Sequence, residues 1–209
     1  MALDNYANLK ASIESWSHRG DVNGLIDDFI LLAETEMYSN ADAQIRLRDM
    51  ISTETSSTGL SDRVQALPTD FLEMRSFRIT QSTNNWYEID YKTPKDMVVR
   101  ANTGLPNYFT ITSQIEYDVV PDMDYPTDII YYGKLTGLSS SNTTNAILTR
   151  FPNIYLYGSL WALNQWANNE EEESKYYVKF IKAIAGANAM ENEGNIGAAP
   201  QKRVYARNP

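Results

Sequence analysis

The sequence predicts an α+β protein: a helical bundle from N- and C-terminal helices, with an inserted, mainly antiparallel β domain and an extended C-terminal tail. Three observations predict this class. Apolar residues recur at helical spacing near the N-terminus, β-type patterns fill the middle, and a dense apolar helix followed by a charged one comes after them. We expect a discontinuous bundle domain formed by residues 1–41 and 142–190. The inserted β domain is expected over residues 42–141, and a flexible tail over residues 191–209.

Composition excludes several classes of function. The 209 residues are 43% hydrophobic and 22% charged, which is ordinary for a soluble protein that buries a core. The absence of cysteine excludes disulfides and thiolate sites, and a single histidine argues against His-rich zinc sites and a standard His triad. A net charge of −9 argues against a general nucleic-acid binder. No signal peptide or transmembrane pattern is recognisable, so we expect cytosolic synthesis and no membrane partner.

Two helices are expected in the N-terminal part. The first runs from Asp4, a candidate N-cap, to Ser17. Its apolar stripe is Tyr6, Leu9, Ile13 and Trp16. Gly20 is expected to take a left-handed conformation after it, and Asp21 to cap a second helix that ends near Asn40. The apolar residues of the second helix are Val22, Leu25, Phe29, Leu32 and Met37.

The middle of the chain alternates between strand-like runs and turns. β-Branched and aromatic residues at a period of two favour strands. The expected strands are 52–58, 64–67, 73–80, 86–91, 107–112, 115–120 and 127–135. A capping-box pattern at Thr93–Asp96 also predicts a short helix over 94–101.

The run from Phe151 to Asn168 predicts the central helix of the bundle, after a short helical turn over 145–150. Pro152 suits the first turn of this helix. Gly158 costs a helix interior roughly 1 kcal/mol relative to alanine, which predicts the close approach of another helix. Apolar side chains cover most sides of this helix, as in the middle of a bundle: Leu156, Tyr157, Leu160, Trp161, Leu163, Trp166 and Ala167.

A last helix is expected to begin near Asn169. Four glutamates, 170–173, occupy its first turn, where the helix dipole favours negative charge, and we prefer this interpretation to a cation site. Gly186 is expected to end the helix. The expected buried stripe is Tyr177, Phe180, Ile181 and Ile184.

The sequence nominates no catalytic, cofactor-binding or metal site. It contains no glycine-rich phosphate loop and no G-x-S-x-G elbow, although carboxylate pairs that form only in space stay open. Asp27 and Glu34 could form a carboxylate pair on one helix, but a solvated face is the simpler interpretation. His18 could act as a lone base, but a partly exposed residue after a helix end explains it better.

An acidic run around prolines could bind Ca²⁺ through oxygen ligands, but it lacks the spacing and the glycine of an EF-hand loop. We therefore expect a solvated acidic loop there. Its carboxylates are Asp118, Asp122, Asp124 and Asp128.

Several segments together resemble the head-to-tail adaptor proteins of short-tailed bacteriophages, the family that includes tail tubular protein A. The similarity in order and spacing extends from Leu9 to Ala185. The segments are WSHRGDVNGLIDDFILLAETEM, LPTDFLEMRSFRI, GLPNYFTI, VVPDMDYPTDIIYYGKLTGLS and NIYLYGSLWAL. The residues that match the motifs are Trp16, Arg19, Asp21, Pro68, Asp70, Tyr155, Tyr157 and Gly158. For the first three of these residues we expect a role in helix-turn stability and not in catalysis.

The resemblance implies a structural virion protein of the phage neck and no enzyme. It implies a homo-oligomeric ring of about twelve copies, closed by rotation, between the portal protein and the tail nozzle protein. Double-stranded DNA would pass through the channel during genome ejection, and assembly would take place in the host cytoplasm. An acidic protein agrees with this role, because its surface repels the DNA backbone.

The last residues of the chain are basic and low in apolar content, which predicts disorder in the free protein. Family members are similar in using a C-terminal extension to grip the portal. We expect portal contacts from Lys202, Arg203, Val204, Tyr205 and Arg207. A solvated terminus without a role is the alternative.

Two other functions stay open. One is a carbohydrate-binding or glycan-cleaving tail component, in which exposed aromatic rings of the β domain stack on sugars. The candidate rings are Trp86, Tyr87, Tyr131 and Tyr132. The other is a portal-independent stopper, which differs from the adaptor only in its position along the tail.

Overall fold

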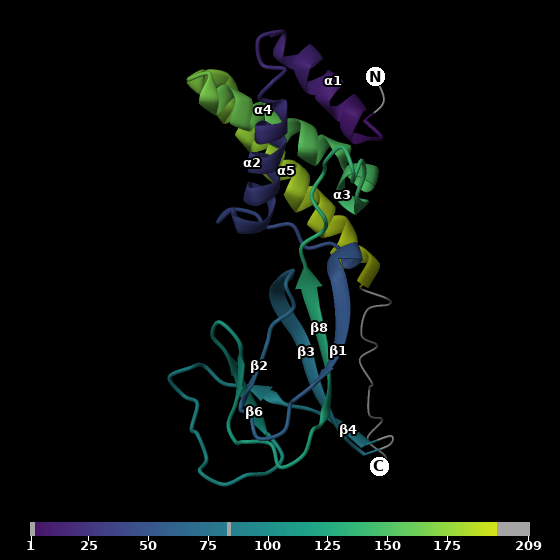
Figure 1. Cartoon of the computed structure of the whole chain (residues 1–209). Helices are drawn as coiled ribbons and strands as arrows, with labels where there is room; N and C mark the ends of the chain where they lie inside the picture. Colours follow the sequence, from purple (N-terminus) through teal and green to yellow (C-terminus); the bar gives the residue numbers. More distant parts are fainter. Residues whose placement is uncertain (1–2, 83–84, 196–209) are drawn as a thin grey trace, which may run out of the picture. The chain divides into compact units, whose positions relative to one another are not determined.

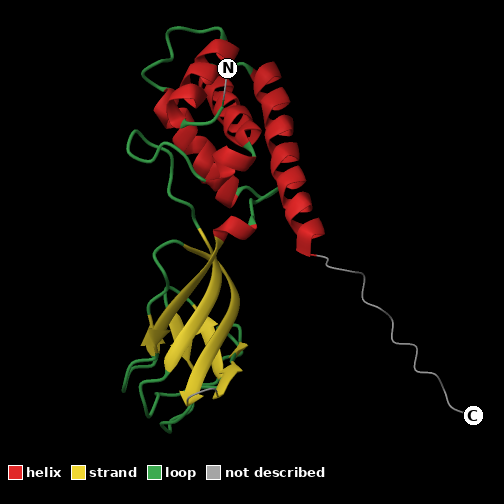
Figure 2. Ribbon diagram, turned by 90° about the vertical axis from the view of Figure 1, so that its right-hand side faces the viewer, coloured by secondary structure: helices red, strands yellow, loops and turns green. Residues whose placement is uncertain are grey.

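The computed structural model describes residues 3–82 and 85–195, and it confirms an α+β protein. Contacts within the chain define two compact units. The boundaries between them lie after Arg48 and after Leu135, whereas the sequence suggests boundaries after residues 41 and 141. Throughout the described residues, the five α-helices belong to the first unit and the eight strands to the second (Figures 1 and 2). A single 3₁₀ turn, Arg48–Met50, spans the first boundary.

The first unit is built around one helix, as the sequence predicts. The helices are α1 (Tyr6–Ser17), α2 (Ile26–Ser39), α3 (Ala146–Arg150), α4 (Pro152–Trp166) and α5 (Glu170–Asn195). Helix α4 packs against all four others. It is buried on most of its sides, which explains its dense apolar sequence; its buried residues are Ile154, Tyr155, Leu156, Gly158, Ser159, Leu160, Ala162, Leu163 and Asn164.

Helices α1 and α2 both begin later than expected. The N-cap of α1 is Asn5 and not Asp4, because Oδ1 of Asn5 accepts the backbone N–H of Asn8 at 2.9 Å. Before α2, the N–H of Leu25 donates to the carbonyl of Val22 at 2.8 Å, so this segment is a turn that precedes the helix.

Helix α5 continues beyond Gly186 to Asn195, past the expected start of the tail at residue 191. Burial explains the continuation, because Ala187 and Glu191 are each 2% exposed and extend the stripe by further helical turns. Tyr177 and Ile181 are only half-buried. The buried stripe is Tyr176, Phe180, Ile184, Ala187 and Glu191.

The second unit contains two four-stranded sheets. One is antiparallel, with strand order β1-β8-β3-β4, and the other has the order β2-β7-β6-β5, with only β5 and β6 parallel. The bounds are β1 Ile51–Ser57, β2 Val64–Gln65, β3 Phe71–Ser82, β4 Asn85–Glu88, β5 Asp90–Tyr91, β6 Tyr108–Ile111, β7 Ile115–Tyr117 and β8 Pro126–Gly133. Residues from both sheets, together with Ile89 and Tyr125 from the adjoining chain, form one buried cluster: Phe77, Ile79, Ile89, Phe109, Ile115, Tyr117, Tyr125, Ile129 and Tyr131.

Two local predictions in this unit are wrong. The expected strand 86–91 is divided at Ile89, which is buried and marks the point where the chain leaves one sheet for the other. The expected helix 94–101 is a turn followed by extended chain. Thr93 and Asp96 do hydrogen-bond, at 2.7 Å between Oγ1 and Oδ2, but the N–H of Arg100 then donates to the carbonyl of Asp118. This bond to a distant segment replaces the helical one.

Across the described ranges, no helix combines the length and the apolar character needed to cross a membrane.

Candidate functional site

The motif at the turn between α1 and α2 is packed against α4. Arg19 donates two hydrogen bonds to Asp21, at 3.0 Å from Nε to Oδ1 and 2.6 Å from Nη2 to Oδ2. Its guanidinium lies 5.3 Å from the centre of the Trp166 ring, and the ring centres of Trp16 and Tyr157 are 6.4 Å apart. The structure thus brings together motif residues that lie more than a hundred positions apart in sequence.

A polar pocket of about 500 Å³ lies beside this turn and is lined in part by Trp16 and Arg19. His18 also lines it and, instead of Gly20, takes the left-handed conformation, with φ 52°. The cations of the pocket already have acidic partners, since Lys175 pairs with Glu172 at 2.8 Å and Arg19 pairs with Asp21. The pocket therefore offers no excess charge with which to bind an ion.

Glu34 of α2 is buried, which contradicts the expected solvated face. Its Oε1 accepts the Tyr155 hydroxyl at 2.8 Å and the N–H of Leu138 at 2.7 Å. The Tyr155 hydroxyl in turn accepts Nδ2 of Asn145 at 2.7 Å. Burial raises the pKa of the Glu34 carboxyl, although these two hydrogen bonds oppose the rise. Asp27 is exposed and pairs with Lys10, so Asp27 and Glu34 do not form a carboxylate pair.

Gly158 lies where two helices approach α4, as its position in the sequence predicts. A Cβ at Gly158 would lie 2.9 Å from Cβ of Ala33 on α2 and 2.9 Å from Cε2 of Phe180 on α5. Both distances are shorter than van der Waals contact, so only glycine fits without a shift of a neighbour.

Glu191 forms a second buried carboxylate site that the sequence did not indicate. Oε2 of Glu191 accepts two hydrogen bonds of 3.0 Å from Arg48, one from its backbone N–H and one from its side-chain Nε. Oε1 accepts a hydrogen bond from Nη2 of Arg150. Burial opposes the charge, but the Arg48 amide and the two guanidiniums lower the pKa of Glu191 to about 2. The last turns of α5 are thereby attached to the segment before β1 and to α3.

Pro68 and Asp70 shape the start of β3. The carbonyl of Pro68 accepts the N–H of Phe71 at 3.1 Å, which closes a turn. Oδ1 of Asp70 accepts a hydrogen bond from the Tyr131 hydroxyl at 2.8 Å. The backbone carbonyl of Asp70 accepts one from the N–H of Lys134 at 2.7 Å. The two motif residues therefore attach this turn to the end of β8.

The acidic loop is not a cation site. Asp118 is 1% exposed; its Oδ1 accepts the N–H of Asn107 at 3.0 Å, and its Oδ2 pairs with Nη2 of Arg100 at 2.6 Å. The other three carboxylates accept hydrogen bonds from separate partners: Asp122 from Tyr125, Asp124 from Gly59 and Asp128 from Thr55. Over residues 3–82 and 85–195, no group of His, Cys, Asp and Glu side chains is placed to hold a metal ion.

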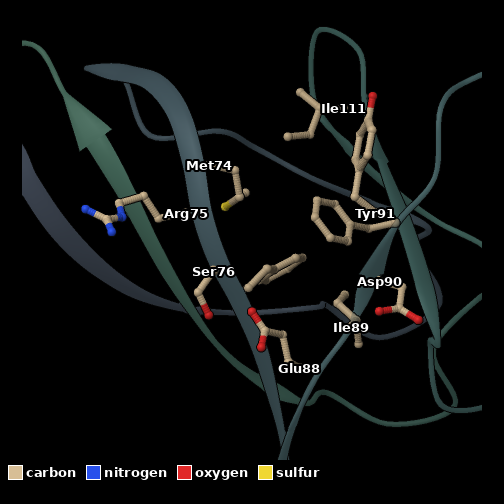
Figure 3. Close-up of a pocket in the computed structure, with 10 residues that line it drawn as sticks. Met74, Arg75, Ser76, Glu88, Ile89, Asp90, Tyr91 and Ile111 are labelled. Carbon is tan, nitrogen blue, oxygen red and sulfur yellow. The ribbon is translucent and has the colours of Figure 1, made fainter. Parts of the chain in front are cut away.

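A groove of about 620 Å³ lies between the two sheets, beside β3, β5 and β6. Figure 3 shows Met74 of β3 directed toward the side of the groove that carries Ile111, and Arg75 directed away from it. The exposed acids Glu88 and Asp90 belong to the same lining. An apolar groove beside strand edges can bind an extended peptide segment.

The aromatic residues proposed for sugar stacking do not form one exposed surface. Tyr131 is 5% exposed, and the Tyr87 hydroxyl donates to the carbonyl of Pro106 at 2.9 Å. Trp86 is 56% exposed, but the guanidinium of Arg78 lies 4.4 Å from its ring centre. The geometry therefore gives the carbohydrate-binding alternative no support.

The expected portal-binding residues lie outside the described part of the chain: Lys202, Arg203, Val204, Tyr205 and Arg207.

A family model described as SU10 adaptor protein matches residues 4–203, which is nearly the whole chain and includes both units. A search of the curated proteins found no match.

Proposed function

Because the chain belongs to the SU10 adaptor protein family, we propose that it is the head-to-tail adaptor that joins the portal to the tail nozzle in a phage neck. One observation carries the proposal: the family match runs through the helical unit, the β unit and part of the C-terminal segment. Membership of this family gives the protein the structural role of a phage adaptor, which agrees with its not being an enzyme.

In the proposed assembly, about twelve copies form a closed ring around a DNA channel. The net charge of −9 supports a channel role, since an acidic surface repels the phosphate backbone and lets DNA slide through it. The ring is a neck component of the virion and assembles in the host cytoplasm.

The proposed portal contact is the basic end of the chain. Val204 and Tyr205 would supply apolar anchors, and Lys202, Arg203 and Arg207 would meet acidic groups on the portal. About a dozen such segments acting from one ring would gain avidity over a single one.

The motif residues have a supporting role in this proposal. Trp16, Arg19 and Asp21 fix the turn between α1 and α2, while Tyr155 and Gly158 fix the packing of α4. A surface that must match a portal in every copy needs such fixed positions.

Mixing the purified protein with its portal tests the proposal. Negative-stain images and a mass measurement should show a ring of about twelve adaptor copies on each portal. A soluble complex of one adaptor with one portal chain, or no binding at all, would refute it. Release of reducing sugar from host polysaccharide, lost on changing one carboxylate, would instead favour the glycan-cleaving alternative.

A further inference from the structure

The groove of the β unit lies between two strand edges. Strand β3 is paired with β8 from Phe71 to Ile79, whereas β4 covers its other edge only from Arg78 to Ser82. After Ile89 the chain joins the other sheet as β5, an edge strand that pairs with β6 alone. As far as the chain is described, no strand covers the β4 side of β3 over Phe71–Ser76. The carbonyl of the next residue, Phe77, already accepts the N–H of Ile89 at 3.1 Å. Such an edge is a template for one more strand.

The groove has an apolar floor beside this edge. The rings of Phe77 and Phe109 meet edge to face with their centres 5.0 Å apart, and Tyr91 lies 5.6 Å from Phe109. Tyr91 is 51% exposed, so an apolar ligand could cover it. The hydroxyl of Ser76, in the same lining, is buried and has no hydrogen-bond partner within the described residues.

The charge of the groove is negative. Glu88 and Asp90 are exposed at its lining. Arg75 also belongs to the lining, but its side chain is directed away from the groove, as Figure 3 shows, and its Nη1 donates to the Tyr132 hydroxyl at 3.0 Å. Arg78 lies opposite Glu88 in the strand register, but its guanidinium covers the Trp86 ring. The chemistry therefore fits an extended segment that carries apolar and cationic side chains.

We propose that this groove binds the C-terminal segment Lys202–Arg207 of a second copy of the chain as an added strand on β3. The sequence KRVYAR carries three cations together with valine and tyrosine, two residue types that favour strands. In a strand, Arg203, Tyr205 and Arg207 share one face and Val204 the other. One face can then meet Glu88 and Asp90 while the backbone pairs with the β3 edge.

The groove and the portal then compete for one segment. Copies that hold each other through the groove release the segment when a portal is present. The groove is tested on the adaptor alone, so its failure would leave the portal proposal untouched.

The direct test uses a labelled peptide with the sequence of residues 200–209 and a chain that ends at Asn195, so that α5 is complete and the groove has no competitor. The peptide should bind, and E88Q with D90N should weaken binding about tenfold and reduce its salt dependence. The matched control, E170Q with E171Q, removes two exposed carboxylates of α5 and should leave binding unchanged. A peptide with both arginines replaced by glutamate should not bind.

A second measurement identifies the occupant. The full chain should associate with rising concentration in analytical ultracentrifugation, and the chain that ends at Asn195 should not. Saturable peptide binding that the groove variants weaken, together with this association, establishes the site. Absence of binding, equal binding by the groove variants, or a full chain that stays monomeric while excluding the peptide would each overturn the proposal as stated.

Discussion

The hydroxyl of Tyr155 on α4 donates a hydrogen bond of 2.8 Å to the buried carboxylate of Glu34 on α2. The oxygen that accepts this bond, Oε1 of Glu34, also accepts the N–H of Leu138. Gly137 lies so close to Glu34 that a Cβ added to this glycine would be 2.7 Å from Oε2. One carboxylate thus holds together α2, α4 and the segment that enters the helical unit from the β unit.

Tyr155→Phe should destabilise the protein by about 1–3 kcal/mol, because Glu34 loses a donor while it stays buried. Urea unfolding measures this loss. Tyr6→Phe is the matched control, since its hydroxyl donates to the exposed Asp27, and it should cost about 0.5 kcal/mol or less. Equal effects of the two changes would show that the buried bond has no special weight.

Glu34→Gln should change the pH dependence of stability in a definite direction. The folded state raises the pKa of Glu34, so its protonated form is favoured there, and its contribution is lost as the pH rises above about 4.3 through the raised pKa. Unfolding free energies of the variant, measured from pH 4 to 7, should decline less with pH than those of the wild type. A steeper decline would contradict this assignment.

Gly158→Ala and Gly186→Ala should have opposite signs, although both glycines lie in helices. A Cβ at Gly158 would overlap Ala33 and Phe180, and such overpacking costs about 1–3 kcal/mol. At Gly186 nothing lies within 4 Å, so alanine should stabilise α5 by up to about 1 kcal/mol. Melting temperatures that shift in the same direction would mean that the packing around α4 differs from that described.

Glu191→Gln should lower the free energy of unfolding near neutral pH, because it removes the ionised carboxylate that the wild type keeps until strong acid. The folded pKa of about 2 lies below the unfolded value, so the contribution is present above about 4.3 and is lost as the pH falls toward 2. Acid unfolding followed by circular dichroism should begin at a higher pH in the variant. Superimposable acid transitions would refute the role of this carboxylate.

Truncation should separate the helix from the segment after it. A chain that ends at Asn195 keeps Glu191 and its contacts, and it should melt within a degree or two of the full chain but dock weakly on portals. A chain that ends at Met190 loses Glu191 and should melt at a clearly lower temperature. Full portal occupancy by the chain that ends at Asn195 would show that the basic end has no role in docking.

The sequence by itself determined those elements whose signal is local. The apolar run of α4, the glycine at its helix crossing and the alternating strands around β3 and β8 follow from period and residue type. The motif order likewise sufficed to identify a phage adaptor, which the family match from residue 4 to 203 bears out at that level.

Only the tertiary structure decided which polar residues are buried and where some elements end. Glu34 and Tyr155 are 121 positions apart, and Arg48 and Glu191 are 143 apart, so no local pattern shows that they meet. The same holds for Asp118, for the continuation of α5 past Gly186 and for the division of β4 from β5 at Ile89. Whether a carboxylate on a helix is buried or solvated, and whether a helix continues past a glycine, depends on the distant segments that pack against the helix. Those segments determine the burial and the hydrogen-bond partners of each residue, and a local sequence pattern does not contain them.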